Sequence, residues 1–283
     1  MSENHVSIDS LVPAEMAKKA EDVGVKKASL DFWTMFALAI LAGAFIGLGA
    51  IFATTVGTGG SELPFGVNKL LMGLVFTLGL IAVVVGGAEL FTGNNLIVMA
   101  YLSGKVPFTK LLRNWGIVYL GNLVGSVLTA YFMFLSKQYT FASGGIGLTI
   151  LNIGEAKCNL GFVQAIALGV MCNAMVCLAV WLTFSARTTT DKILAIIPPI
   201  SGFVAAGLEH SVANMYFIPM ALFVKYFGDP KFFETVGKTA QDYPHLTMNN
   251  FLVANLLPVT IGNMIGGVVM VGVVYWFIYL RKK

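Results

Sequence analysis

The chain has 283 residues, of which 57% are hydrophobic and 11% are charged, and its formal net charge is +4. Soluble domains carry about 25% charged residues, so this composition excludes an ordinary soluble enzyme and indicates a protein embedded in a lipid bilayer. The basic residues lie beside the apolar segments, and the net charge calls for no nucleic-acid partner. The three cysteines form no CxxC pair, and we expect no disulfide framework and no metal site or other cofactor.

Residues 1–28 are polar and lack the apolar core of a signal peptide, so we expect a cytoplasmic N-terminal tail. Within it, Pro13 suits a first helical turn, and Met16, Ala20 and Val23 recur at helical spacing. The sequence therefore predicts a short amphipathic helix over residues 13–23. Two interpretations of this helix stay open: a solvated or lipid-surface helix, which the spacing favours, and a plug for a pore.

The rest of the chain, residues 29–283, contains six apolar segments and forms one transmembrane domain. They lie near residues 32–56, 65–104, 108–136, 160–186, 191–226 and 249–280. The second and fifth are too long for a straight span, because 35 residues of helix extend ~52 Å against a hydrocarbon core of ~30 Å. Glycines and polar residues interrupt both, which is typical of broken helices that line a cavity. We therefore predict an all-α polytopic protein with six spans, two of them broken.

The distribution of Lys and Arg supports six spans. In that topology 12 of the 18 basic residues lie on the side of the two chain ends. The positive-inside rule then places both termini in the cytoplasm of a multi-pass protein of the inner (plasma) membrane.

An internal repeat divides the transmembrane domain into two halves, at about residues 29–136 and about residues 160–280. Three short matches occur in the same order in both halves: Gly43–Gly47 with Gly169–Asn173, Glu89 with Glu209, and Gly121–Ser126 with Gly262–Gly267. Each half holds three spans, so the halves must be inverted relative to each other. Inverted repeats with paired broken helices place a substrate site near the membrane midplane.

The two breaks carry the ionisable groups of the apolar segments. Glu89 is the only charge between residues 70 and 104, and Glu209 and His210 are the only ionisable groups between residues 193 and 224. Ionisable residues within a membrane span are energetically costly, so we expect these three to have a function. The second half-helices begin near Thr92 and Ser211, and their free backbone N–H groups favour an anion.

His210 is the sharpest candidate, because it can be neutral or charged near physiological pH. We expect it to act in a pore with Thr92, although a structural histidine stays an alternative. For Glu89 and Glu209 we favour a structural role, in which each carboxylate accepts backbone N–H groups freed by its break. Asn94 and Asn214 belong to the same two breaks.

Three lone amides and two aromatic residues complete the candidate set. We interpret Asn122 and Asn263 as contacts between helices, because each lies in a small-xxx-small pattern. Asn173 is a candidate for lining a pore. Phe76 and Phe203 precede the two breaks and are candidates for a hydrophobic constriction.

These residues resemble the formate/nitrite transporter family over essentially the whole chain, most of all its formate channel branch. The motifs that carry the resemblance are Gly87–Thr92, Gly121–Gly125, Cys177–Trp181, Gly207–Met215 and Pro258–Asn263. The chain departs from that branch at Glu89 and Gly93, where formate channels carry Asp and Ser. The substrate within the family therefore stays open.

The resemblance implies an aquaporin-like six-helix protomer, a homopentamer in the lipid bilayer and one pore per protomer. It implies that Thr92 and His210 face each other at the pore centre, with Asn173 nearby. It further implies constrictions at Phe76 and Phe203 on the periplasmic side and at Leu80 on the cytoplasmic side. It makes Lys157 a residue that draws anions to the outer mouth, and it makes the tail helix a gate at low pH.

The leading hypothesis is a channel or proton-coupled transporter for formate and related small monovalent anions, including nitrite. In it, His210, tuned by Thr92 and Glu209, shares a proton with the anion, since burying a bare charge costs many kcal/mol. A nitrite- or hydrosulfide-selective channel of the same family is the first alternative. A membrane-embedded enzyme with Glu209 and His210 as acid and base is a second, and a water or glycerol channel is a third.

Overall fold

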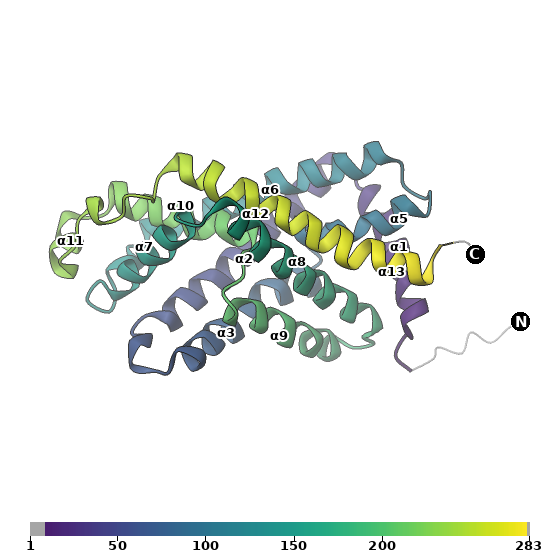
Figure 1. Ribbon diagram of the computed structural model, residues 1–283, viewed down its shortest axis with the longest axis horizontal. Coiled ribbons are helices and arrows are strands. Elements are labelled where there is room, and N and C mark those ends of the chain that lie inside the picture. The colour runs from purple at the N-terminus through teal and green to yellow at the C-terminus, as the bar shows by residue number, and fades with distance from the viewer. Residues whose placement is uncertain (1–8, 282–283) are drawn as a thin grey trace, which may run out of the picture.

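The computed structural model describes residues 9–281, and these are helical with no strand among them (Figure 1). The first half of the chain contains α1 (Pro13–Ala28), α2 (Phe32–Gly57), α3 (Phe65–Gly86), α4 (Phe91–Asn94), α5 (Val98–Leu102) and α6 (Phe108–Leu135). The second half contains α7 (Gly145–Cys158), α8 (Phe162–Ser185), α9 (Thr189–Ala205), α10 (Ser211–Phe227), α11 (Pro230–Val236), α12 (Leu257–Met264) and α13 (Val274–Tyr279). Short 3₁₀ turns lie at Gly60–Glu62, Asn95–Ile97, Gln138–Thr140 and Ala240–Asp242, and π-helical turns at Asn250–Leu256 and Ile265–Val273.

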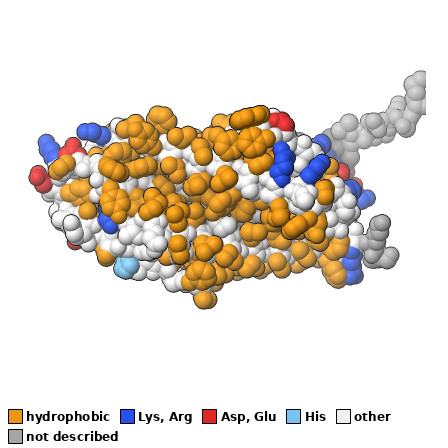
Figure 2. Space-filling view, turned by 90° about the horizontal axis from the view of Figure 1, so that it is seen from above, with side chains coloured by type: hydrophobic (Ala, Val, Ile, Leu, Met, Phe, Trp, Pro, Cys, Tyr) orange, Lys and Arg blue, Asp and Glu red, His pale blue; other side chains and the backbone are white. Residues whose placement is uncertain are grey.

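Five helical stretches of the described chain are long and apolar enough to cross a membrane: Phe32–Gly57, Phe65–Gly86, Phe108–Leu135, Phe162–Ser185 and Asn250–Tyr279. The remaining apolar segment is divided between α9 and α10, which have 17 residues each. Apolar side chains form a broad band over the middle of the molecule, and charged side chains gather towards its two ends (Figure 2). The polytopic all-α prediction is confirmed.

Both predicted helix breaks are present. The chain leaves α3 through Gly87 at φ +79° and leaves α9 through Gly207 at φ +71°. Because a side chain is strained in this left-handed region, glycine is the residue that ends each half-helix there. The new half-helices begin at Phe91 and Ser211, within one residue of the predicted starts.

Close helix contacts show how the two repeats correspond. A Cβ on Gly125 of α6 would lie 2.0 Å from the Ile40 carbonyl oxygen, and one on Gly266 would lie 2.1 Å from that of Val170. Ile40 therefore corresponds to Val170, which pairs Gly43 with Asn173. The predicted match of Gly43–Gly47 with Gly169–Asn173 is wrong by one helical turn. The sequence match aligns Gly43 with Gly169, whereas the contacts between helices align Gly43 with Asn173.

α1 precedes the three spans of the first repeat, as α7 precedes those of the second, and it packs against the protein. α1 continues to Ala28, five residues beyond the predicted helix, and buries Met16 and Ala20. A Cβ on its Gly24 would lie 3.1 Å from Ala100 of α5. α1 thus packs on protein, and its interpretation as a solvated or lipid-surface helix is wrong. α1 and α13 lie at the same end of the molecule (Figure 1).

Candidate functional site: two vestibules joined at a histidine–threonine pair

A polar network holds the first helix break. The Glu89 carboxylate accepts hydrogen bonds from Lys27 Nζ (2.6 Å) and from Asn94 Nδ2 (2.7 Å). Asn94 Nδ2 also donates to Asn114 Oδ1 (2.9 Å), and Asn114 Nδ2 donates to the Lys27 carbonyl oxygen (3.2 Å). Four residues from α1, the break, α4 and α6 therefore form a closed ring around one buried carboxylate.

The second break carries the same ring. Lys157 Nζ and Asn214 Nδ2 donate to the Glu209 carboxylate (2.7 and 2.6 Å). Asn214 Nδ2 also donates to Asn255 Oδ1 (2.7 Å), and Asn255 Nδ2 donates to the Lys157 carbonyl oxygen (2.9 Å). Because a buried charge is costly unless it is paired and hydrogen-bonded, the repetition of this ring identifies it as the support of each break.

Two asparagines bind the backbone groups that the breaks leave free. Asn122 Oδ1 accepts from the Phe91 N–H (2.9 Å), and Asn263 Oδ1 accepts from the Ser211 N–H (2.8 Å). Each amide also donates to the carbonyl oxygen of the break glutamate in its own repeat (2.9 Å in both). The expectation that the glutamate carboxylates accept backbone N–H groups is therefore wrong. Side-chain amides from a neighbouring helix satisfy these groups.

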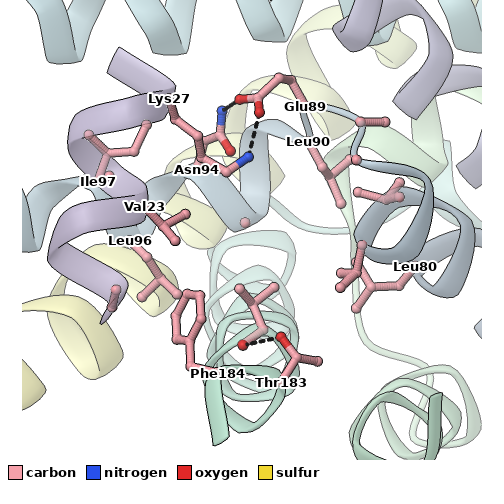
Figure 3. Close-up of a pocket in the computed structure, with 18 of the residues that line it drawn as sticks. Val23, Lys27, Leu80, Glu89, Leu90, Asn94, Leu96, Ile97, Thr183 and Phe184 are labelled. Carbon is pink, nitrogen blue, oxygen red and sulfur yellow. Dashed lines mark hydrogen bonds and ion pairs between the residues drawn. The ribbon is translucent and has the colours of Figure 1, made fainter. Parts of the chain in front are cut away.

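Two cavities reach the breaks from opposite sides. The first vestibule has a volume of about 340 Å³, and its lining includes Lys19 and Lys192. Figure 3 shows further lining residues, among them Lys27, Leu80, Glu89, Leu90 and Asn94. The second vestibule has a volume of about 430 Å³, and its lining includes Lys69, Phe76, Lys157, Phe203, Glu209, His210 and Asn214. Each vestibule therefore holds one of the two lysine–glutamate pairs.

The predicted constriction residues lie between the vestibules. The rings of Phe76 and Phe203 are in edge-to-face contact with centroids 5.7 Å apart, and both side chains are buried. Phe76 lines the second vestibule and Leu80, on the same helix, lines the first. Four residues of helix advance ~6 Å, so the apolar barrier along α3 is about one helical turn thick.

Thr92 and His210 meet at this barrier. Thr92 Oγ1 lies 3.0 Å from His210 Nε2, and both residues are buried, at 0% and 2% exposed. The Ala213 N–H donates to His210 Nδ1 (3.0 Å), so the histidine caps the N-terminus of α10. The Phe203 ring stacks on the imidazole with centroids 5.9 Å apart.

These contacts fix the direction of the central hydrogen bond. Because Nδ1 accepts from a backbone N–H, the neutral imidazole carries its proton on Nε2. Nε2 therefore donates to Thr92 Oγ1, and the Thr92 hydroxyl proton has no acceptor among the described residues. Glu209, although next in sequence to His210, contributes its carboxylate to Lys157, Asn214 and Asn255 and makes no hydrogen bond to the imidazole among the described residues.

Asn173 is fully buried and lies behind Thr92. Its Nδ2 lies within hydrogen-bond distance of the carbonyl oxygens of Thr92 (3.2 Å) and Asn263 (2.7 Å) and of Asn95 Oδ1 (2.9 Å). The Cys177 thiol also donates to the Thr92 carbonyl oxygen (3.3 Å). Asn173 therefore holds the half-helix that carries Thr92, and it does not line either vestibule.

Sequence reasoning missed three residues of the two rings: Lys27, Asn114 and Asn255. The amides could have been found, because Asn114 precedes Asn122 by the same eight residues that separate Asn255 from Asn263. Lys27 had no such signal, since it lies among other charged residues of the N-terminal segment.

Comparisons with known proteins agree with this architecture. The family model for the formate/nitrite transporter matches residues 14–277. The formate channel FocA of Escherichia coli (strain K12) is 47% identical over 97% of this chain and 96% of its own length. FocA of Haemophilus influenzae is 42% identical over 96% of each chain. A solved pentameric formate channel with formate bound has 48% identity and a TM-score of 0.84, and the match covers 88% of this chain and 98% of that one. The chain thus belongs to the formate/nitrite transporter family.

Proposed function

We propose that this protein is a membrane channel for formate and related small monovalent anions, with Thr92 and His210 at the centre of the pathway. The observation that carries the proposal is their contact. A hydroxyl from one repeat and an imidazole from the other lie 3.0 Å apart in an apolar barrier between two vestibules. The solved relative with formate bound supports the substrate class.

The geometry suits a small anion that passes without being trapped. Moving a bare carboxylate into an apolar barrier costs many kcal/mol, and a permanent cation there would hold the anion. Here Lys27 and Lys157 stay in the vestibules, each paired with a glutamate. At the barrier the anion meets the Thr92 hydroxyl, which the His210 Nε2–H polarises.

Proton coupling imposes a further condition. Neutral imidazole is too weak an acid to protonate a carboxylate. His210 must therefore be protonated to imidazolium before it can donate a proton to a passing anion. The added proton goes to Nδ1 and breaks the bond from the Ala213 N–H. In the coupled form of the proposal, imidazolium passes one proton through the Thr92 hydroxyl to the carboxylate, leaving neutral imidazole and the neutral acid.

Formate flux into liposomes tests the proposal. We expect His210→Ala to change both the rate and the pH dependence of formate uptake. His245→Ala is the matched control, because that histidine is exposed and pairs with Glu155 outside the vestibules. Unchanged flux and pH dependence in His210→Ala would contradict the role of the central pair.

Alternatives are tested in the same assay. Nitrite, hydrosulfide and lactate are compared with formate at equal concentration, and a nitrite or hydrosulfide channel would rank formate below these ions. A water or glycerol channel would swell in uncharged osmolytes. The relatives are channels and not enzymes. The Glu209 carboxylate is held by three donors, a poor arrangement for an acid–base partner of His210.

We also infer a homopentamer in the plasma membrane, with both chain ends in the cytoplasm. The pentameric solved relative supports the assembly. The position of α1 and α13 at one end of the molecule supports the orientation (Figure 1). Native mass spectrometry tests the pentamer, and reporters fused to each end test the orientation. A monomer, or reporters active on opposite sides, would contradict them.

A further inference from the structure

The first vestibule carries more positive charge than its ion pair explains. Three lysines line it, Lys19, Lys27 and Lys192, and Glu89 is the one carboxylate of its lining. Lys27 forms an ion pair with Glu89 (Figure 3), with an Nζ–Oε1 distance of 2.6 Å. Two ammonium groups, from α1 and from the first turn of α9, therefore remain at one cavity.

The remaining two lysines have no carboxylate partner within residues 9–281. Lys19 Nζ donates to the Phe184 carbonyl oxygen (2.9 Å) at the C-terminal end of α8. The pKa of the Lys19 ammonium is lowered, mainly by burial and to a smaller extent by the positive charges of Lys192 and Arg187. Lys192 and Arg187 thus lie close enough to Lys19 to repel its ammonium group. Such a cluster is unfavourable until an anion joins it.

Asp191, the neighbour of Lys192 in sequence, is already engaged. The Asp191 carboxylate accepts hydrogen bonds from the backbone N–H groups of Arg187 (3.0 Å) and Thr188 (2.9 Å) and so caps α9. It is exposed and is not among the residues that line the cavity. Lys19 and Lys192 therefore line the cavity without a carboxylate partner among the described residues.

We propose that the first vestibule binds a small dianion, a dicarboxylate or inorganic phosphate, between Lys19 of α1 and Lys192 of α9. Two ammonium groups match two negative charges, whereas one monovalent anion leaves a net positive charge. The volume of about 340 Å³ admits such an ion beside the Lys27–Glu89 pair. A dianion in this position bridges α1 to α9 at the mouth of the vestibule, so it slows the entry of monovalent anions from that side. This inference does not depend on the proposed substrate.

Lysine labelling of the purified full-length protein tests the site. An amine-reactive acetylating reagent is applied in chloride, formate, malonate or phosphate at equal ionic strength, and each lysine is quantified by mass spectrometry. We expect malonate or phosphate to slow the labelling of Lys19 and Lys192 several-fold, and formate to have a much smaller effect. A difference between malonate and phosphate shows whether carboxylates or phosphates are preferred. Lys110, exposed at the start of α6, is the internal reference and should not change.

A variant separates binding from the folding of α1. Lys192→Gln leaves the Lys19–Phe184 contact in place, and it should abolish the protection of Lys19 by the dianion. Lys110→Gln should leave it intact. Equal labelling in all four salts, equal protection by formate, or protection that survives Lys192→Gln would overturn the proposal. The readout is lysine labelling and not flux. The result therefore decides the dianion proposal independently of whether the protein transports formate.

Discussion

Lys27 and Lys157 occupy equivalent positions of the two repeats, and each forms an ion pair with the glutamate of its own helix break. The Nζ–Oε1 distances are 2.6 Å to Glu89 and 2.7 Å to Glu209. The two lysines differ in exposure, since 28% of the Lys27 side chain is accessible against 16% of Lys157. Because water compensates an unpaired charge only where it can reach it, the two pairs should respond differently to mutation.

We expect Glu209→Gln to destabilise the protein more than Glu89→Gln. Removing one partner of a buried pair costs about 3–5 kcal/mol, because the other charge stays buried and unpaired. Glu209→Gln leaves the less accessible Lys157 unpaired and should approach this range, whereas Glu89→Gln leaves the more accessible Lys27 unpaired and should fall below it. Thermal unfolding of the purified variants measures the difference. The double variant Lys157→Met/Glu209→Gln should recover part of the loss, and equal effects of the two single variants would contradict the exposure argument.

The direction of the central hydrogen bond predicts a difference between two Thr92 variants. Thr92→Ser keeps a hydroxyl that accepts from His210 Nε2 and donates to the anion, so formate flux should stay close to that of the wild type. Thr92→Val has a similar size but no hydroxyl, and it leaves the Nε2–H unpaired at a cost of about 1–3 kcal/mol. We expect its flux to fall at least tenfold, which initial rates in liposomes would show. Equal flux in the two variants would exclude a role for the hydroxyl.

The closest helix contacts predict which glycines the fold requires. Alanine at Gly125 or Gly266 would place Cβ about 2 Å from a backbone carbonyl oxygen of the facing helix. The backbones must then separate, so both variants should lose most of their folded yield. Gly116→Ala is the matched control on the same helix as Gly125, because nothing lies within 4 Å of its Cβ position. It should fold as well as the wild type or better, and size-exclusion chromatography of the detergent-extracted proteins measures this.

An ion pair between an exposed lysine and a buried glutamate connects α1 to the loop after α5. Lys105 pairs with Glu21, and the hydrogen bond with that carboxylate raises the pKa of the Lys105 ammonium. The folded pKa is the higher one, so this contribution is complete below the unfolded value of about 10.5 and is lost only as the pH rises through the raised value. We therefore expect the stabilisation of α1 by the Lys105–Glu21 pair to stay constant from about pH 6.5 to about pH 8.5.

Cysteine labelling tests this stabilisation of α1. The three native cysteines are buried, so a cysteine placed at Ala20, on the buried face of α1, reports exposure of that face. Maleimide should label Ala20→Cys slowly and, after correction for thiol ionisation, at a rate independent of pH in this range. Adding Lys105→Met should raise the rate, whereas Ala14→Cys, at an exposed position, should label fast in both backgrounds. No change on adding Lys105→Met would show that packing alone holds α1.

Local features of the sequence determined the six apolar segments, the two breaks and the ionisable groups at them. Segment length, glycine before each break and a lone charge in an apolar run act within a few residues, so they can be recognised without knowledge of the fold. The His210–Thr92 pair also followed from the sequence, through the failure of the repeat at those positions and the resemblance to a known family. Their contact at 3.0 Å agrees with that expectation.

The partners of these residues were decided by tertiary structure. Lys27 reaches Glu89 across 62 positions of sequence, and Asn122 reaches Phe91 from another helix. The predicted match of Gly43 with Gly169 is wrong by one helical turn, because the register of the first span depends on which backbone each glycine approaches. A hydrogen bond or a close contact depends on the distance between helices, and no local pattern in the chain encodes that distance.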